Sequence, residues 1–139
     1  MIYRVAYVST ASHAFSEEEI QDLLVKARDK NKGLDITGVL IHRKGHFLQI
    51  LEGPEQNVEE LYEVISHDPR HEAVSMIHRQ YDEDRIFKLG WYMAYKGFEE
   101  YSEDIRSLIE DMIYSKSGGE TVDSRDELIE LARSIKNVA

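Results

Sequence analysis

The stretch from residue 47 to residue 51 constrains the fold most, because it is apolar on both sides of a single uncharged amide. It reads Phe47-Leu48-Gln49-Ile50-Leu51. In a β-strand, residues 47, 49 and 51 would share one face and residues 48 and 50 the other. Other elements must then cover both faces, as in a sheet with helices on each side. A buried amide left unpaired costs about 1 to 3 kcal/mol, so Gln49 must find partners.

Periodicity and turn residues predict the order of the elements. Ser16 and Glu19 form a capping box, the usual start of a helix, and Gly33 is typical of its end. Arg43-Lys44-Gly45 favours a hairpin turn. In chain order we expect a strand at 2–10, a helix ending at residue 33, strands at 36–42 and 46–52, a helix through 58–65, strands at 73–81 and 92–96, and helices through 105–112 and 128–135.

This order predicts an α+β fold, a ferredoxin-like βαββαβ sandwich with a five-stranded mixed sheet. Right-handed crossovers place the first two helices on one face, and we expect the first and third strands to be adjacent and parallel. Tyr7 and Gln49 could then meet. The C-terminal helices should cover the opposite face, which carries Leu48 and Ile50.

Tyr7 and Gln49 leave two interpretations open. A tyrosine hydroxyl beside a glutamine amide can simply satisfy both groups on burial. The same pair could instead be a donor and relay that contacts a redox ligand. Trp91 and Met93, two residues apart, would point the same way on a strand and pack together in the core.

Composition and motifs exclude several classes of function. The net charge of -10 over 139 residues disfavours nucleic-acid and anionic-membrane binding. The chain has no cysteine, no long apolar run, no phosphate-binding glycine loop and no nucleophile elbow, so we expect a cytoplasmic protein that is not an enzyme.

His67 and His71 have metal-ligand spacing, but Pro69 lies between them and we expect no metal site. An acylphosphatase-like enzyme would need an arginine in the loop after the first strand, where the chain has residues 10–13, Thr-Ala-Ser-His.

Several motifs together resemble the BLUF domain, a family of flavin-binding blue-light sensors, and they occur in order from about residue 2 to residue 97. They are Tyr7 within Val5-Ala6-Tyr7-Val8-Ser9, Asn31, Ile36-Thr37-Gly38, the run from Phe47 to Pro54, Asp68-Pro69-Arg70-His71, and Trp91-Tyr92-Met93.

The resemblance implies non-covalent FAD, or FMN in some preparations, with the ring between the first two helices. It implies a flavin-binding core at 1–97 and a helical extension of the same domain at 98–139. By position, Asn31 would bind the ring edge and Gln49 would bridge Tyr7 to the flavin. The other cofactor-binding residues that it implies are Leu23 and Ile65 around the ring, Arg70 and His71 towards the ribityl or phosphate end, Lys30 and Lys32 as helpers, and Asp68.

The resemblance also implies a mechanism. Blue light would excite the flavin, Tyr7 would give up an electron and a proton, and Gln49 would rotate or tautomerise. Trp91 and Met93 would shift and pass the change to the C-terminal helices; which of the two lines the pocket in the dark stays open. The chain after Gly97 is too short for a cyclase, so we expect signalling in trans to a partner protein.

The C-terminal residues and the fold class lead to two further expectations. Leu128, Leu131, Ala132 and Ile135 form an apolar stripe, which suggests self-association as a homo-oligomer. The alternative to a photoreceptor is a light-insensitive ferredoxin-like module for ligand binding or assembly.

Overall fold

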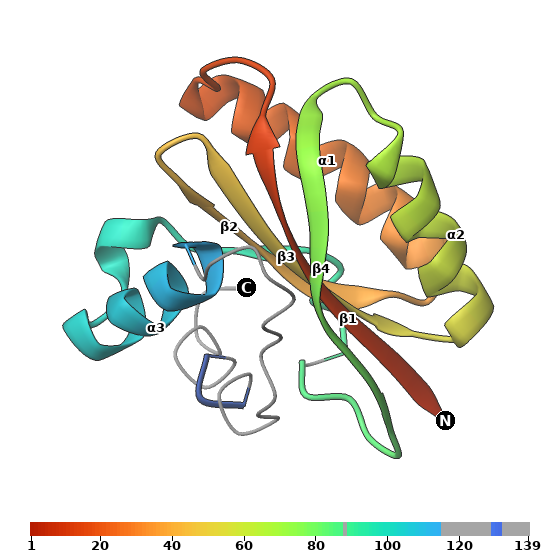
Figure 1. Ribbon diagram of the computed structural model, residues 1–139. Helices are drawn as coiled ribbons and strands as arrows, with labels where there is room; N and C mark the ends of the chain where they lie inside the picture. The colour runs from red at the N-terminus through yellow and green to blue at the C-terminus, as the bar shows by residue number, and fades with distance from the viewer. Residues whose placement is uncertain (88, 115–128, 132–139) are drawn as a thin grey trace.

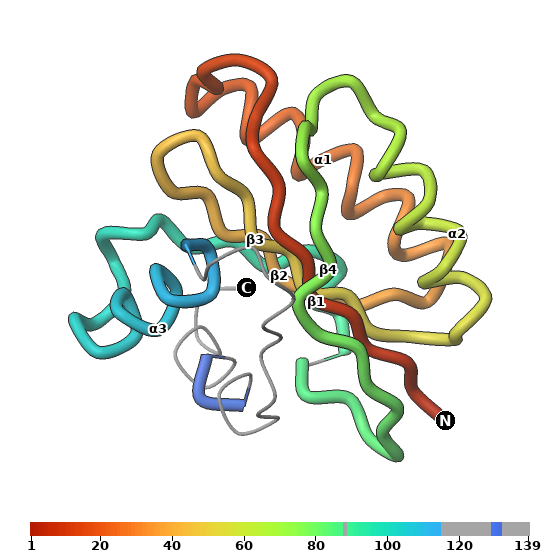
Figure 2. The backbone as a smooth tube through the Cα atoms, in the orientation of Figure 1, coloured from red at the N-terminus to blue at the C-terminus, as the bar shows by residue number. Residues whose placement is uncertain are grey.

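Five strands form one sheet, and helices cover both of its faces. The computed structural model describes residues 1–87, 89–114 and 129–131. The elements are β1 (Ile2–Ala11), α1 (Glu17–Gly33), β2 (Thr37–Arg43), β3 (His46–Gly53), α2 (Glu55–Ser66), β4 (His71–Asp82), β5 (Ala94–Tyr95), a short 3-10 helix η1 (Phe98–Glu100) and α3 (Glu103–Tyr114). The strand order is β4-β1-β3-β2-β5, so β1 lies between β4 and β3 (Figures 1 and 2). This arrangement confirms the predicted α+β sandwich.

The sheet is mixed, as predicted, but the expected parallel pairing of the first and third strands is wrong. β1 and β3 are antiparallel, and only β2 and β5 pair in parallel among the described strands. The right-handed crossover makes β2 run parallel to β1, and the hairpin then reverses β3. Tyr7 lies directly opposite Gln49 in this antiparallel register, so the predicted encounter of the two residues still occurs.

Local sequence explains where α1 and the hairpin begin and end. The Ser16 hydroxyl accepts from the Glu19 N–H at 3.1 Å, and the Glu19 carboxylate accepts from the Ser16 N–H at 3.1 Å. This is the predicted capping box. Between β2 and β3, Lys44 and Gly45 have φ of 47° and 78°, as a two-residue hairpin turn requires.

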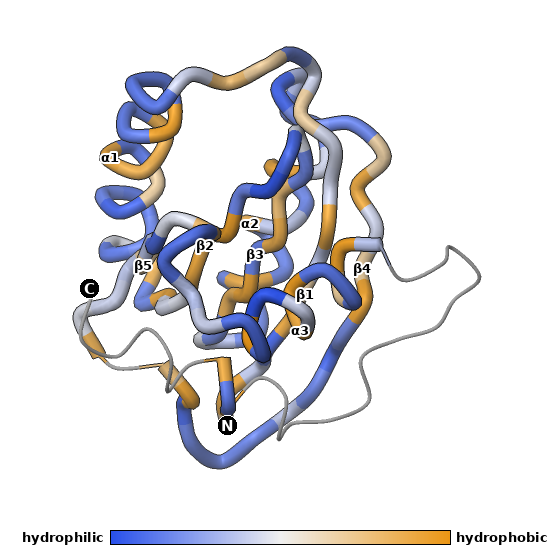
Figure 3. Tube along the Cα trace, turned by 90° about the vertical axis from the view of Figure 1, so that its left-hand side faces the viewer, coloured by the Kyte–Doolittle hydropathy of each residue, from blue (hydrophilic) through white to orange (hydrophobic). Residues whose placement is uncertain are grey.

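The two faces of β3 belong to two separate hydrophobic cores. Leu51 packs with Leu24 of α1 and Leu61 of α2 on one face. Figure 3 shows hydrophobic and hydrophilic residues alternating along α1, as expected of a helix with one buried side. Leu48 packs with Ile109 of α3 on the other face, so both sides of the Gln49 strand are covered as predicted.

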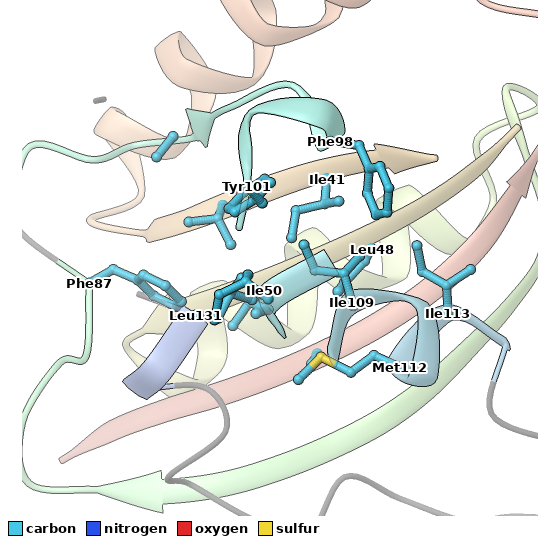
Figure 4. Packing of buried hydrophobic residues seen from close by; sticks show 14 of the residues in the cluster. Ile41, Leu48, Ile50, Phe87, Phe98, Tyr101, Ile109, Met112, Ile113 and Leu131 are labelled. Carbon is cyan, nitrogen blue, oxygen red and sulfur yellow. The ribbon is translucent and has the colours of Figure 1, made fainter. Parts of the chain in front are cut away.

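The C-terminal part of the chain contributes to this second core. Figure 4 shows Leu131 beside Phe87 and Ile50, and Leu131 is fully buried. Leu131 therefore packs on the face that the C-terminal helices were expected to cover, and its side chain is not exposed for the self-association that the apolar stripe suggested. The other members of that stripe, residues 128, 132 and 135, lie outside the described residues. Within the described ranges, no helix is long and apolar enough to cross a membrane.

A buried polar network ties the segment after β4 to the sheet. The Arg4 and Glu52 side chains form an ion pair of 3.0 Å and are both 0% exposed. The Glu52 carboxylate also accepts from the backbone N–H groups of Ile86 and Phe87, at 3.0 and 2.7 Å, and from the Thr37 hydroxyl at 3.2 Å. These contacts fix the chain on its way from β4 to β5.

Candidate functional site

A cavity of about 570 Å³, its open mouth included, lies between α1 and α2 above the face of β3 that carries Gln49. Its walls are mostly apolar, with two amide groups and several charged groups. The lining residues are Leu23, Lys26, Ala27, Lys30 and Asn31 from α1, Gln49 from β3, Leu61, Val64 and Ile65 from α2, and Asp68, Arg70, His71 and Met93.

Tyr7 and Gln49 form the polar wall at the sheet. The Tyr7 hydroxyl donates a hydrogen bond to Gln49 Oε1, and the two residues are 0% and 4% exposed. Burial raises the pKa of the Tyr7 hydroxyl well above its ordinary value of 10.0, and the neighbouring Tyr62 adds to this rise. Tyr7 therefore keeps its proton. Gln49 Nε2 makes no hydrogen bond to another described residue, so its N–H groups are available on the cavity side.

Asn31 links α1 to the segment that precedes β5. The side chain is 1% exposed, and its Nδ2 donates to the Tyr92 carbonyl oxygen at 2.5 Å. The Asn31 carbonyl oxygen accepts from the backbone N–H groups of Leu34 and Ile36 and so helps to end the helix. The amide retains a second N–H and an oxygen for a ligand.

Met93 and Trp91 lie on opposite sides of the sheet. Met93 lines the cavity and belongs to the core formed with α1 and α2. Trp91 belongs to the core formed with α3. The prediction that both point the same way is wrong, because β5 begins only at Ala94, later than the expected 92–96, and strand alternation does not apply to residues 91–93.

Charged groups surround the mouth of the cavity. The Arg70 guanidinium binds the Asp68 carboxylate at 2.5 to 3.1 Å and lowers the pKa of that carboxyl to about 2, so Asp68 is anionic at neutral pH. Burial lowers the pKa of the His71 imidazole below its ordinary value of 6.5, and its Nδ1 lies 3.0 Å from the Ser9 hydroxyl oxygen. His71 is thus mainly neutral, whereas Lys30 and Arg70 supply positive charge.

The structure brings most of the predicted site residues together. Leu23, Lys30, Asn31, Gln49, Ile65, Asp68, Arg70, His71 and Met93 all line the cavity. Tyr7 lies behind Gln49, and Trp91 and Lys32 are not among the lining residues. Sequence reasoning missed Lys26, Ala27, Leu61 and Val64. For Lys26, Ala27 and Leu61 the signal is helical spacing, since they fall three or four residues from predicted members of α1 and α2, whereas Val64 directly precedes Ile65.

A flavin fits these residues. Apolar side chains from two helices suit the flat faces of a tricyclic ring. The Gln49 and Asn31 amides suit its polar edge, and the cationic groups at the mouth suit a phosphate. The unused Nε2 group of Gln49 is the kind of buried donor that such a ring edge would satisfy.

Comparison with known proteins identifies the family. The family model "BLUF: Sensors of blue-light using FAD" matches residues 2–94. Photoactivated adenylate cyclase subunit beta of Euglena gracilis is 34% identical over 90 residues, which cover 65% of this chain and 10% of that protein. The blue light- and temperature-regulated antirepressor BluF of Escherichia coli (strain K12) is 40% identical over 63 residues, covering 43% and 16%. The matched region is thus a small part of these relatives.

Solved structures agree with this result. The dark-state structure of BlrB, a BLUF protein, has a TM-score of 0.74 and 27% identity, and the match covers 97% of this chain and 95% of BlrB. The structure of Klebsiella pneumoniae BlrP1 with FMN and cyclic diGMP has a TM-score of 0.71 and 30% identity, covering 95% of this chain and 34% of BlrP1.

Family, fold and cavity agree. The matched region is a sensor domain rather than an enzyme, and its cofactor is FAD, with FMN found in one similar structure. The chain belongs to the BLUF family, the sensors of blue light that use FAD.

Proposed function

We propose that this chain is a blue-light photoreceptor whose response is carried by Tyr7 and Gln49, with FAD held non-covalently. The observation that carries the proposal is the hydrogen bond from the Tyr7 hydroxyl to Gln49 Oε1 at the cavity wall, with Gln49 Nε2 left for a ligand. A buried amide with two alternative sets of partners is a two-state element of the kind a switch needs.

The flavin, when bound, would supply the absorption of blue light and the acceptor for one electron. Tyr7 would provide that electron and pass its Oη proton along its hydrogen bond to the Gln49 amide; in the dark, the raised pKa of Tyr7 keeps this proton in place. Gln49 then rotates or tautomerises. When the electron and proton return to Tyr7, the Gln49 amide keeps its new arrangement, and this altered hydrogen bonding is the signalling state.

The remaining site residues hold and orient the cofactor in this proposal. Leu23 and Ile65 lie on opposite helices and enclose the ring, and Asn31 binds its edge. Lys30 and Arg70 supply the positive charge that receives the ribityl phosphate, and His71 lines the cavity with them. The Asp68 carboxylate holds the Arg70 guanidinium in place. Lys32 lies outside this set.

The signal leaves through the segment at residues 91–93. Met93 borders Gln49's cavity, and Trp91 packs in the core shared with Ile109 of α3, so a shift of this segment reaches both faces of the sheet. We propose residues 1–97 as the flavin-binding core and 98–139 as an extension of the same domain. The output acts in trans on a partner protein; a cyclase and an antirepressor among the relatives support regulation of other activities.

The test is spectroscopic. The purified chain, reconstituted with FAD, should be yellow, shift its absorption to the red under blue light and recover in darkness. Gln49→Leu should keep the flavin and lose the red shift, because leucine offers no hydrogen bonds. A matched control, Gln56→Leu on the exposed side of α2, should behave as the wild type. A colourless reconstituted protein, or a normal photocycle in Gln49→Leu, would contradict the proposal.

A further inference from the structure

Three consecutive backbone carbonyl groups before β5 are each held by another part of the molecule. The Trp91 carbonyl oxygen accepts from the Gly38 N–H of β2 at 2.9 Å. The Tyr92 carbonyl oxygen accepts from Asn31 Nδ2 at 2.5 Å, and the Met93 carbonyl oxygen accepts from Arg28 Nε at 2.9 Å. The last two donors belong to α1, which forms one wall of the cavity.

These bonds replace the sheet contacts that the segment lacks. β5 pairs with β2 through only Val39↔Ala94 and Leu40↔Tyr95, so residues 91–93 have no strand ladder of their own. Yet the chain must place Trp91 in one core and Met93 in the other. Donors that fix successive carbonyls determine the backbone path, and the path determines which side chain faces the cavity.

Resting on the proposed function, we infer that Arg28 is a positioning residue of the photoresponse: its guanidinium holds the Met93 carbonyl and thereby keeps the Met93 side chain in the cavity wall near Gln49. Arg28 itself is exposed and does not line the cavity. Its cationic Nε gives a charge-assisted hydrogen bond to a buried residue, which is stronger than a neutral one. Arg28 thus acts through Met93 rather than by contact with the flavin.

The test compares Arg28→Met with Arg28→Lys and with Arg79→Met, which removes the same charge from an exposed position on β4, at the opposite edge of the sheet from β5. The first readout is amide hydrogen exchange, measured in the dark on the full chain as purified. In Arg28→Met the Gly38 amide, which is bonded to Trp91, should exchange about tenfold faster, as expected for the loss of one hydrogen bond to a charged group. Amides of the β1–β3 ladder should be unchanged.

The second readout is the photocycle. Arg28→Met should change the rate of dark recovery by about tenfold, and Arg28→Lys, which keeps a charged donor, should restore most of it. Arg79→Met should match the wild type in both readouts. Unchanged exchange at Gly38, or exchange that rises equally across the whole sheet, would overturn the inference. Because exchange needs no photocycle, it decides the role of Arg28 even if the proposed photochemistry fails.

Discussion

Glu52→Gln should destabilise the protein far more than its small change in shape suggests. In the wild type, Oε1 accepts from the Phe87 N–H and the Thr37 hydroxyl, and Oε2 accepts from Arg4 Nε and the Ile86 N–H. Glutamine has one oxygen and one NH₂ group. Whichever oxygen is replaced, the new NH₂ group faces at least one N–H donor that cannot turn away.

The magnitude follows from this donor set. The orientation of the new amide that costs less free energy places its NH₂ group beside the Thr37 hydroxyl, which can rotate. The Phe87 N–H, which lies 2.7 Å from Oε1 in the wild type, then loses its acceptor. The Arg4 side chain, 0% exposed, loses one carboxylate partner but keeps Asp82, whose Oδ2 lies 3.2 Å from Arg4 Nη1. An unsatisfied buried donor costs about 1 to 3 kcal/mol, and the weakened ion pair brings the expected loss to about 3 kcal/mol. With a urea m-value of about 2 kcal/mol/M, the unfolding midpoint should fall by roughly 1.5 M.

The assay is urea unfolding followed by circular dichroism at neutral pH. The control is Glu63→Gln, since the Glu63 side chain is 71% exposed and should change the free energy of unfolding by no more than about 0.5 kcal/mol. A Glu52→Gln midpoint within about 0.3 M of the control would refute the reasoning, because it would mean that the buried donors find other acceptors at little cost.

Two further predictions concern a glycine and a titrating carboxylate. In Gly38→Ala, the new Cβ would lie 2.2 Å from the Ile50 backbone oxygen, so we expect a loss of about 3 kcal/mol in urea unfolding, whereas Gly33→Ala meets nothing within 4 Å and should gain about 0.5 kcal/mol. Asp68 has a pKa lowered to about 2, so its pair with Arg70 stabilises the fold above pH 3.8 and fades as the pH falls towards 2. Unfolding midpoints of Asp68→Asn should therefore lie below those of the wild type at neutral pH and converge with them in this acidic window; a constant gap down to pH 2 would contradict the assignment.

The sequence predicted the layers from local patterns, and it predicted the Tyr7–Gln49 contact from those patterns together with the adjacency of the first and third strands. Alternation along residues 46–52 decides which face Gln49 occupies, and the capping box at Ser16 decides where α1 begins. The prediction that β1 and β3 are parallel was wrong because the hairpin between β2 and β3 reverses the chain once more after the crossover. In the observed antiparallel register, Gln49 lies directly opposite Tyr7.

Other features could not be read from the sequence because they depend on contacts between distant residues. Arg4 and Glu52 look like ordinary exposed charges in alternating strands, and only the assembled sheet shows that they neutralise each other. The positions of Trp91 and Met93 depend on Gly38, Asn31 and Arg28, which precede them by more than fifty residues. Pattern analysis within a short window does not detect such contacts.

The position of β1 between two antiparallel neighbours has a consequence for synthesis. On the ribosome, β1 is made before both of its partners, β3 and β4. Its buried residues, among them Val5, Ala6 and Tyr7, therefore have no ladder to join until the chain has been translated as far as His46, and the second edge stays open until β4 has emerged. An apolar strand whose partner strands are not yet synthesised is a typical binding site for chaperones, and slower translation would lengthen its exposure.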